Sequence, residues 1–409
     1  MEQNFNKKIG KKLFVKIFAY SNSINIFSFL FVILLSRYLT KNDFSLITSL
    51  TSFGMGAAYL LSFFVPLLSN IISKNNKIDL RSFYTNSLFI FIFFFIILTF
   101  ITYQCKDYFF EFYKFDNIKI LIIFVTIVIL NIFLYLQLGI LNGLLEFKFH
   151  TRVQALQQVL RVILIIIFFT YFYKISLAIG ATLISLFLTV IIFHFKIINS
   201  NLFAQTPKKK YLMNKLFNKE RIIKSILFSL LVSFLIYHDI SLSRYVLDYN
   251  KSSEFNIYSS LSKINYYLMI GIIHTLIPLN NIKNNELNKI FNKKAILITL
   301  AFFLMPNIFY FFYSDQFINI IFGYNVSNSH VYLLKINLSS LFFTLSIILL
   351  NYNYDKLSYK FYLCIFILIF IYLINLIFQD NLNIFINYIL LFNIFLLLIM
   401  IFKKLKFND

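Results

Sequence analysis

"LLSRYLTKNDFSLITSL" occupies residues 34–50, directly after a long apolar run, and "SLSRYVLDYNKSSEFNIYSSLSK" occupies residues 241–263 after another. The two Ser-Arg-Tyr copies lie 207 residues apart in a chain of 409, close to half its length. A fixed offset between similar segments indicates internal duplication, which predicts further matches at a similar spacing.

Two more landmarks recur in the same order. "VPLLSNIISKNN" at 65–76 matches "IPLNNIKNN" at 277–285 and aligns Pro66 with Pro278, while Asn142 matches Asn351. The three pairs predict two copies of a six-span unit, with lobes at residues 1–206 and 207–409. Because six is even, both copies cross the membrane in the same direction. They are therefore predicted to be parallel repeats that enclose a central cavity.

The composition is that of a membrane protein. Hydrophobic residues make up 60% of the chain, charged residues 13%, and the mean hydropathy is +0.78. Soluble proteins carry about 25% charged residues, and about 20 apolar residues span a bilayer as a helix. We therefore predict an all-α integral membrane protein with about 12 spans, near residues 13–36, 45–72, 83–104, 120–141, 152–173, 175–195, 225–243, 256–280, 294–313, 329–350, 359–378 and 382–402.

The distribution of charge predicts the orientation. With both termini on the cytoplasmic side, most of the 38 Lys and Arg residues fall in cytoplasmic segments, as short positive loops do. The largest basic segment is a linker at about 196–224. The excess positive charge indicates the topology and a contact with anionic lipid, and it does not imply nucleic acid.

Charged residues within spans are costly in lipid and are therefore candidates for function. Four are cations, Lys16, Arg161, Lys263 and Lys335, and one is an acid, Asp239. This net positive charge favours an anionic substrate carrying phosphate or diphosphate. Lys16 and Lys335 lie near span ends, where a long side chain can also reach the membrane surface.

The fifth span carries a polar stripe. His150, Gln154, Gln157, Gln158 and Arg161 follow one another at i, i+4, i+7, i+8 and i+11, which is one face of a helix. Such a face is expected to line a cavity or to form hydrogen bonds with another helix. Arg161 and the three glutamines are our first candidates for substrate binding.

The second set of candidates lies in the seventh and eighth spans. Lys263 shares a helical face with Tyr267 and His274, and Asp239 follows His238. A histidine titrates near neutral pH, so His274, Asp239 and His238 are candidates for ion coupling, with buried hydrogen-bonding histidines as the alternative. We find no catalytic or metal-binding motif and no motif for a cofactor.

Several junctions resemble those of a known family. "LLSRYLTKNDFSLITSLTSFG", "DISLSRYVLDYNKSSEFNIYSSLSKI", "LNGLLEFKFHTRVQALQQVLR" and "FINIIFGYNVSNSHVYLLKINL" are similar to helix junctions of the polysaccharide flippases, the O-antigen (Wzx-like) translocases of the multidrug/oligosaccharidyl-lipid/polysaccharide (MOP) exporter superfamily. The usual glycine after the turn is absent at "KNDFSLI" and "SSEFNIY".

This resemblance implies a function in lipopolysaccharide and polysaccharide biosynthesis, in a bacterial inner (plasma) membrane. The chain would move an isoprenoid-diphosphate-linked oligosaccharide from the inner to the outer leaflet, coupled to an ion gradient and without acting as an enzyme. Its expected partners are that substrate, membrane lipids and polysaccharide-assembly enzymes. The alternatives are a membrane polysaccharide polymerase or glycosyltransferase, and a small-molecule exporter of the same fold.

The Ser-Arg-Tyr copies fall at the predicted outer ends of the first and seventh spans. There an arginine can extend to the lipid headgroups, and tyrosine is common at the interface. We therefore expect Arg37 and Arg244 to be structural residues at the membrane border, with a contact at an outer gate as the alternative.

Overall fold

The computed structural model describes residues 2–74, 80–172, 175–200, 219–280, 285–326, 329–352 and 358–406, and the part it describes contains helices and no strand. Side chains are left out within some helices, including those of residues 2–18, 268–280 and 285–295. Lys16, His274 and Pro278 therefore lie outside the described side chains, as do residues 201–218 of the predicted linker.

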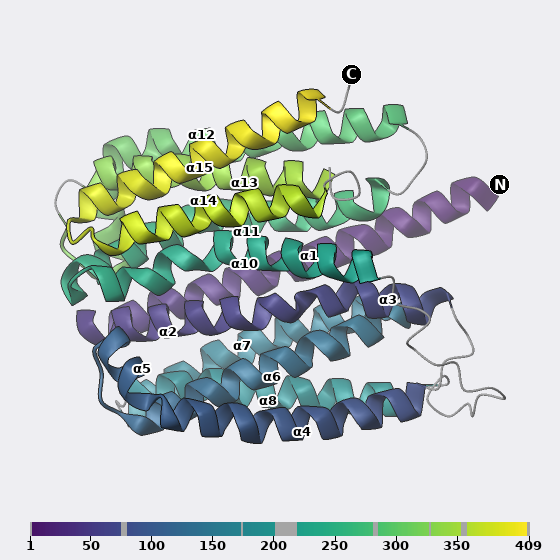
Figure 1. The fold of residues 1–409 in the computed structure, drawn as a ribbon, viewed down its shortest axis with the longest axis horizontal. Coiled ribbons are helices and arrows are strands. Elements are labelled where there is room, and N and C mark those ends of the chain that lie inside the picture. The colour runs from purple at the N-terminus through teal and green to yellow at the C-terminus, as the bar shows by residue number, and fades with distance from the viewer. Residues whose placement is uncertain are drawn as a thin grey trace. The chain divides into compact units, whose positions relative to one another are not determined.

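The helices occur where the twelve apolar runs predicted them (Figure 1). In order they are α1 (Glu2–Tyr38), α2 (Lys41–Tyr59), α3 (Phe64–Lys74), α4 (Leu80–Gln104), α5 (Lys106–Tyr113), α6 (Ile118–Gly143), α7 (Phe147–Tyr171), α8 (Ile175–Ile198), α10 (Lys219–Val246), α11 (Tyr249–Asn280), α12 (Asn285–Phe322), α13 (Ser329–Tyr352), α14 (Tyr359–Ile377) and α15 (Leu382–Lys406).

Most of these helices can cross a bilayer. Among the described residues, nine helical segments are long and apolar enough to span it, and Asn22–Tyr38 and Phe361–Ile377 are shorter apolar helices. Together with α11 they account for every predicted span. The prediction of an all-α membrane protein with about twelve spans is confirmed.

Proline explains the break in the second span. The helix changes to a 3-10 turn at Leu60–Phe63 between α2 and α3. Pro66 has no N–H to donate to the carbonyl four residues earlier, and its ring crowds that carbonyl. One predicted span is therefore two α-helical pieces joined by a tighter turn.

The chain divides into two compact units. Unit 1 comprises residues 1–31 and 50–238, and unit 2 comprises residues 32–49 and 239–409. Three helices, α1, α2 and α10, therefore contribute residues to both units. This division follows compactness, and the division into repeats at 206/207 remains a prediction based on sequence offsets.

The two units have a similar internal arrangement. In unit 1, α6 packs against α3, α4 and α8, and in unit 2, α13 packs against α11, α12 and α15. These are the fourth and tenth spans, each surrounded by the second, third and sixth spans of its own copy. Equivalent pairing in both halves is what parallel six-helix repeats predict.

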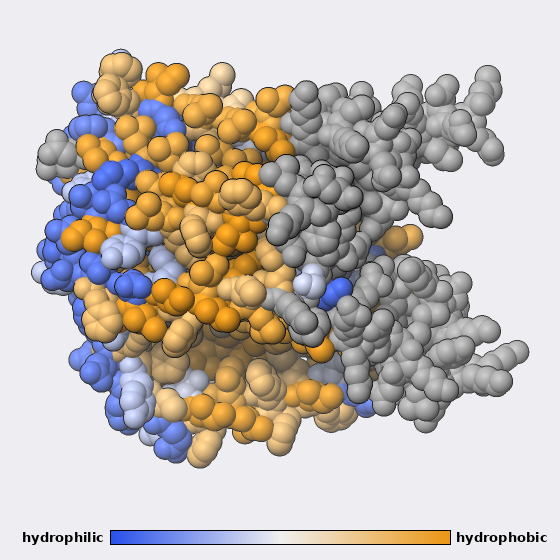
Figure 2. All heavy atoms as spheres, turned by 45° about the horizontal axis from the view of Figure 1, so that its top comes forward, coloured by the Kyte–Doolittle hydropathy of each residue, from blue (hydrophilic) through white to orange (hydrophobic). Residues whose placement is uncertain are grey.

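The outer surface of the helices is suited to lipid. Only 6% of the apolar window of α4 and 17% of that of α12 is buried, whereas 61% of α6 and 72% of α13 is buried. Large apolar side chains such as Phe93 and Phe312 are exposed. Figure 2 shows hydrophobic residues over much of the described surface and hydrophilic residues gathered at one end of the helices.

Two features were not predicted. The short helix α5, "KDYFFEFY", follows α4 directly, and α12 continues to Phe322, well past the predicted end at residue 313. Near the end of α12, Asp315 accepts hydrogen bonds from the backbone N–H and the hydroxyl of Ser329, and so caps the start of α13. Asp315 therefore links the extended part of α12 to the start of α13, a contact that hydropathy does not detect.

Candidate functional site

Arg161 is the central residue of the candidate site in unit 1. It lies on α7, four turns from the start of the helix, and its guanidinium carbon is 3.4 Å from the ring centroid of Phe31 on α1. Its Nη1 donates a hydrogen bond to Oε1 of Gln158 at 3.2 Å. Its Nε is buried and makes no hydrogen bond with any described residue.

Arg161 also has no charged partner in the described part of the chain. The ion pairs there involve other residues, and none of them includes Arg161. A cation within a span that lacks a carboxylate partner is unusual, because lipid and protein solvate it poorly. The site is therefore electrostatically suited to an anion.

Two residues of the polar stripe on α7 are buried. His150 and Gln158 are each 9% exposed, whereas Arg152, on another face of the same helix, is exposed. Gln154 and Gln157 are half-buried. Apart from the Gln158–Arg161 hydrogen bond, the structure does not assign a role to these glutamines, which remain candidates.

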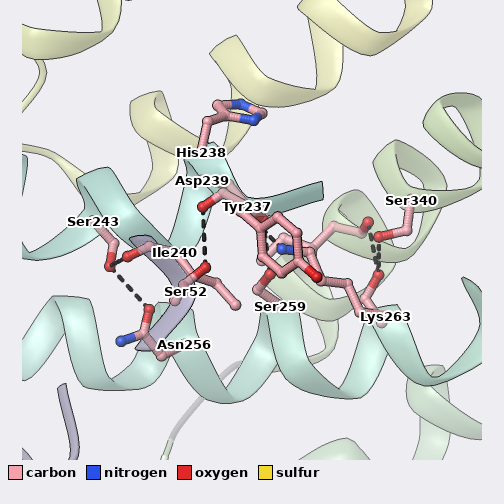
Figure 3. A network of polar contacts seen from close by, with 12 residues as sticks. Ser52, Tyr237, His238, Asp239, Ile240, Ser243, Asn256, Ser259, Lys263 and Ser340 are labelled. Atoms are coloured by element: carbon pink, nitrogen blue, oxygen red, sulfur yellow. Dashed lines mark hydrogen bonds and ion pairs between the residues drawn. The ribbon is translucent and has the colours of Figure 1, made fainter. Parts of the chain in front are cut away.

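The second site lies in unit 2, where Asp239 of α10 meets Lys263 of α11 (Figure 3). The Lys263 ammonium is 2.6 Å from Oδ1 of Asp239, and the two side chains are 5% and 9% exposed. Ser259 donates to Oδ2 of the same carboxylate at 2.8 Å. Since the two opposite charges are paired, Lys263 is not an isolated cation.

Buried polar side chains extend from this pair into the core of unit 2. Ser262 donates to the hydroxyl of Ser340 and to the backbone carbonyl of Ile336, and Asn265 donates to Oδ1 of Asn337. Asn337 in turn donates to the carbonyl of Phe303 on α12, one turn before Pro306. Pro306 lacks the N–H that would bond the carbonyl of Phe302, and the Asn337 amide gives the neighbouring carbonyl of Phe303 a donor from another helix.

The remaining candidates make other contacts. Lys335 on α13 donates to Oδ1 of Asn383 on α15 at 2.7 Å. His238 stacks on Phe234 with ring centroids 4.2 Å apart, and its Nδ1–H donates to the Phe234 carbonyl at 2.7 Å. In Figure 3 the imidazole leaves α10 in a different direction from the Asp239 carboxylate.

The two Ser-Arg-Tyr copies are part of the packing of unit 2. Arg37 donates from Nε to the carbonyl of Ile321 at 2.9 Å, and Ser36 reaches the carbonyl of Phe322, so this copy binds the C-terminal end of α12. Gly323 follows with φ of 75°, the left-handed conformation that ends many helices, and its Cα lies against the Arg37 side chain.

The second copy binds the start of α2. Arg244 donates from Nη1 and Nη2 to the carbonyl and the side-chain oxygen of Asn42, at 2.9 and 2.6 Å. Its side chain is only 2% exposed. The expectation that Arg244 extends to lipid headgroups is therefore wrong, because its guanidinium finds protein partners instead of water.

Residues related by the repeat also contact one another. Ser45 of α2 donates to Ser252 of α11 at 2.9 Å, and Asn256 donates to Thr48 at 2.7 Å. The separation between Ser45 and Ser252 is 207, the same offset as between the motif copies. Equivalent residues meet only near the axis that relates two repeats, so this contact supports the duplication.

A scan against protein-family models and a search of curated proteins found no match. Solved structures share the fold. An inward-facing multidrug resistance MATE family transporter of the MOP superfamily matches with a TM-score of 0.68 and 13% identity over 94% of each chain. An outward-facing one matches with 0.69 and 12% identity over 97% of this chain and 96% of that chain.

A third structure is a MOP superfamily transporter from Pyrococcus furiosus Vc1 (DSM3638), whose binding pocket is described as having reverse polarity that suggests a different function. It matches with a TM-score of 0.63 and 14% identity over 97% of this chain and 96% of that chain. These likenesses establish that the chain has the fold of MATE transporters of the MOP superfamily.

Proposed function

We propose that the chain is a membrane transporter that moves an isoprenoid-diphosphate-linked oligosaccharide, such as an O-antigen repeat unit, from the cytoplasmic to the outer leaflet of a bacterial inner membrane. The observation that carries this proposal is the environment of Arg161. It is a cation within a span, beside glutamines, with no acidic partner among the described residues.

The chemistry of a diphosphate fits this environment. A guanidinium recognises phosphate oxygens through two parallel N–H···O bonds, and the Nε of Arg161 is a buried donor with no described partner. An unsatisfied buried donor costs about 1–3 kcal/mol, which an anionic ligand would recover. Gln154 and Gln157 carry both donors and acceptors, as recognition of sugar hydroxyls requires.

The environment of Asp239 in unit 2 also favours an anionic cargo. A cationic cargo needs a carboxylate that is free to pair with it, but Asp239 is already paired with Lys263 and bonded to Ser259. The fold supports transport, since MATE transporters of this fold have been captured in inward-facing and outward-facing conformations. Alternating access in this chain is part of the proposal.

The second candidate function is export of small molecules. It is favoured by the multidrug resistance MATE transporters, which match at least 94% of this chain. The two functions differ in the charge of the cargo and in whether the cargo is attached to a lipid. Loss of transport on removal of the Arg161 charge is expected only for an anionic cargo.

Deletion of the gene in its source bacterium tests the proposal. We expect lipid-linked saccharide to accumulate on the cytoplasmic leaflet and surface polysaccharide to fall. The wild-type chain and the Arg152→Gln variant should restore export, because Arg152 is an exposed residue of the same helix, whereas Arg161→Gln should not. A deletion strain without accumulated lipid-linked saccharide would contradict the proposal.

A further inference from the structure

The side chain that covers Arg161 is an aromatic ring from another helix. Phe31 of α1 is 1% exposed, and its ring centroid lies 3.4 Å from the guanidinium carbon. At that distance the guanidinium lies against the face of the ring, where the negative potential of the π-system attracts a cation. Phe31 is the last residue of α1 in unit 1.

The ring and Gln158 together determine which edge of the guanidinium remains available. Phe31 covers a face, and Gln158 accepts from Nη1 at 3.2 Å. Nε is a buried donor with no hydrogen-bond partner among the described residues, and the hydrogen bond of this guanidinium to Gln158 uses Nη1 and not Nη2. Because Nε and Nη2 donate in the guanidinium plane, a ring stacked on the face leaves the Nε–Nη2 edge free to bind two oxygens.

We propose that Phe31 is a positioning residue for an anion site at Arg161, and that it presents the Nε–Nη2 edge to a phosphate or diphosphate group. This inference rests on the proposed function and deepens it, since it names the residue that orients the guanidinium toward the phosphate group. A guanidinium held at two points loses less conformational freedom on binding than a free arginine side chain.

The stack also explains why an aliphatic residue is not equivalent at position 31. Leucine preserves apolar burial but has no π-face, so the guanidinium would lose its attraction to the ring and rotate about its own side-chain bonds. Tyrosine keeps the face. The expected order of anion affinity is therefore Phe and Tyr above Leu.

The test is binding of inorganic diphosphate and of farnesyl diphosphate to the purified full chain in detergent, measured by isothermal titration calorimetry. Wild type and Arg152→Gln should bind both probes, and Arg161→Gln should lose binding. Phe31→Leu should weaken binding about tenfold, as loss of a partly desolvated cation–π contact implies, and Phe31→Tyr should stay within about threefold of wild type.

Two controls separate positioning from packing. Phe133→Leu removes a ring that is 3% exposed in the same unit, stacks on Tyr84 and lies tilted against Phe91, with no cation on it, so it should leave affinity unchanged. In the Arg161→Gln background, Phe31→Leu should cause no further change in the binding of either probe, because Phe31 acts through Arg161.

These outcomes distinguish the role of Phe31 from the existence of the anion site at Arg161. If Arg161→Gln abolishes binding while Phe31→Leu binds like wild type, the role of Phe31 is wrong and the anion site stands. If Phe31→Tyr or Phe133→Leu loses as much affinity as Phe31→Leu, the ring serves packing alone. If the wild type binds neither probe, or Arg161→Gln binds as well as wild type, the proposed anion site is also wrong.

Discussion

Asp239 and Lys263 form a buried ion pair, and such pairs are costly to break and contribute little to stability when intact. Both charges are removed from water, and their mutual attraction, with the Ser259 hydrogen bond, offsets that desolvation. Removing one partner leaves the other charge buried without compensation.

We therefore predict that Asp239→Asn and Lys263→Met each destabilise the folded protein by roughly 3–5 kcal/mol, whereas the double variant Asp239→Leu/Lys263→Met is more stable than either. Thermal unfolding of the purified chain in detergent measures this. A double variant that is less stable than both single variants would show that the pair does not act as a unit.

At the residue scale, the sequence identified the charged positions within the spans but not their partners. Asp239 and Lys263 are 24 residues apart on different helices, and their pairing depends on how each helix is rotated, which hydropathy does not specify. Phe31 could not be singled out among 55 phenylalanines. The predicted environment of Arg244 was wrong because its position at the end of a span suggested contact with lipid headgroups, whereas its guanidinium binds Asn42.

At the scale of single helices, close packing of α3 against α6 depends on a glycine. A Cβ added at Gly143 would lie 2.6 Å from Cβ of Ile72, an atom next to the backbone that cannot move without its helix. Gly180 on α8 provides a contrast, because an added Cβ there meets no atom within 4 Å.

We predict that Gly143→Ala lowers the free energy of unfolding by about 1–3 kcal/mol through overpacking. Gly180→Ala should raise it by about 0.5–1 kcal/mol, since alanine loses less backbone entropy in a helix. Parallel thermal melts of the two variants measure the difference. Equal shifts for both would mean that α3 and α6 are not held at this distance.

Hydropathy located every span because an apolar run of sufficient length must form a helix in lipid, where its backbone N–H and C=O groups can bond only to one another. It could not detect α5, which mixes charged and aromatic residues over only 8 residues, or the final turns of α12. Those elements are determined by caps and contacts, such as Arg37 on the carbonyl of Ile321.

At the scale of the whole molecule, the predicted orientation follows from charge bias and has a direct test in the native cysteines. Cys105 is free and lies between α4 and α5, after three spans, so with a cytoplasmic N-terminus it faces outward. Cys364 lies within α14.

In a Cys364→Ser background we predict that a membrane-impermeant maleimide labels Cys105 in spheroplasts without permeabilisation, and that Cys105→Ser abolishes the label. Mass spectrometry of the purified chain measures labelling. Protection of Cys105 until the membrane is opened would reverse the predicted orientation of the chain.

The duplication suggested by two Ser-Arg-Tyr motifs is also a property of the whole molecule. It accounts for the matching packing around α6 and α13 and for the Ser45–Ser252 contact. The fold could therefore be predicted from sequence offsets and hydropathy. The nature of the cargo could be predicted only from the sign of the charges within the spans.

Reconstitution into proteoliposomes tests directly whether the chain transports an anionic lipid-linked saccharide. The full chain is placed in proteoliposomes containing isoprenoid-diphosphate-linked oligosaccharide extracted from the source bacterium, and a glycosidase added outside reports how much saccharide reaches the outer leaflet. We predict exchange between leaflets with wild type and with Arg152→Gln. Arg161→Gln should reduce the rate of exchange tenfold or more, which corresponds to about 1.4 kcal/mol of lost transition-state stabilisation. Exchange by Arg161→Gln at the wild-type rate, or no exchange by wild type, would contradict this prediction.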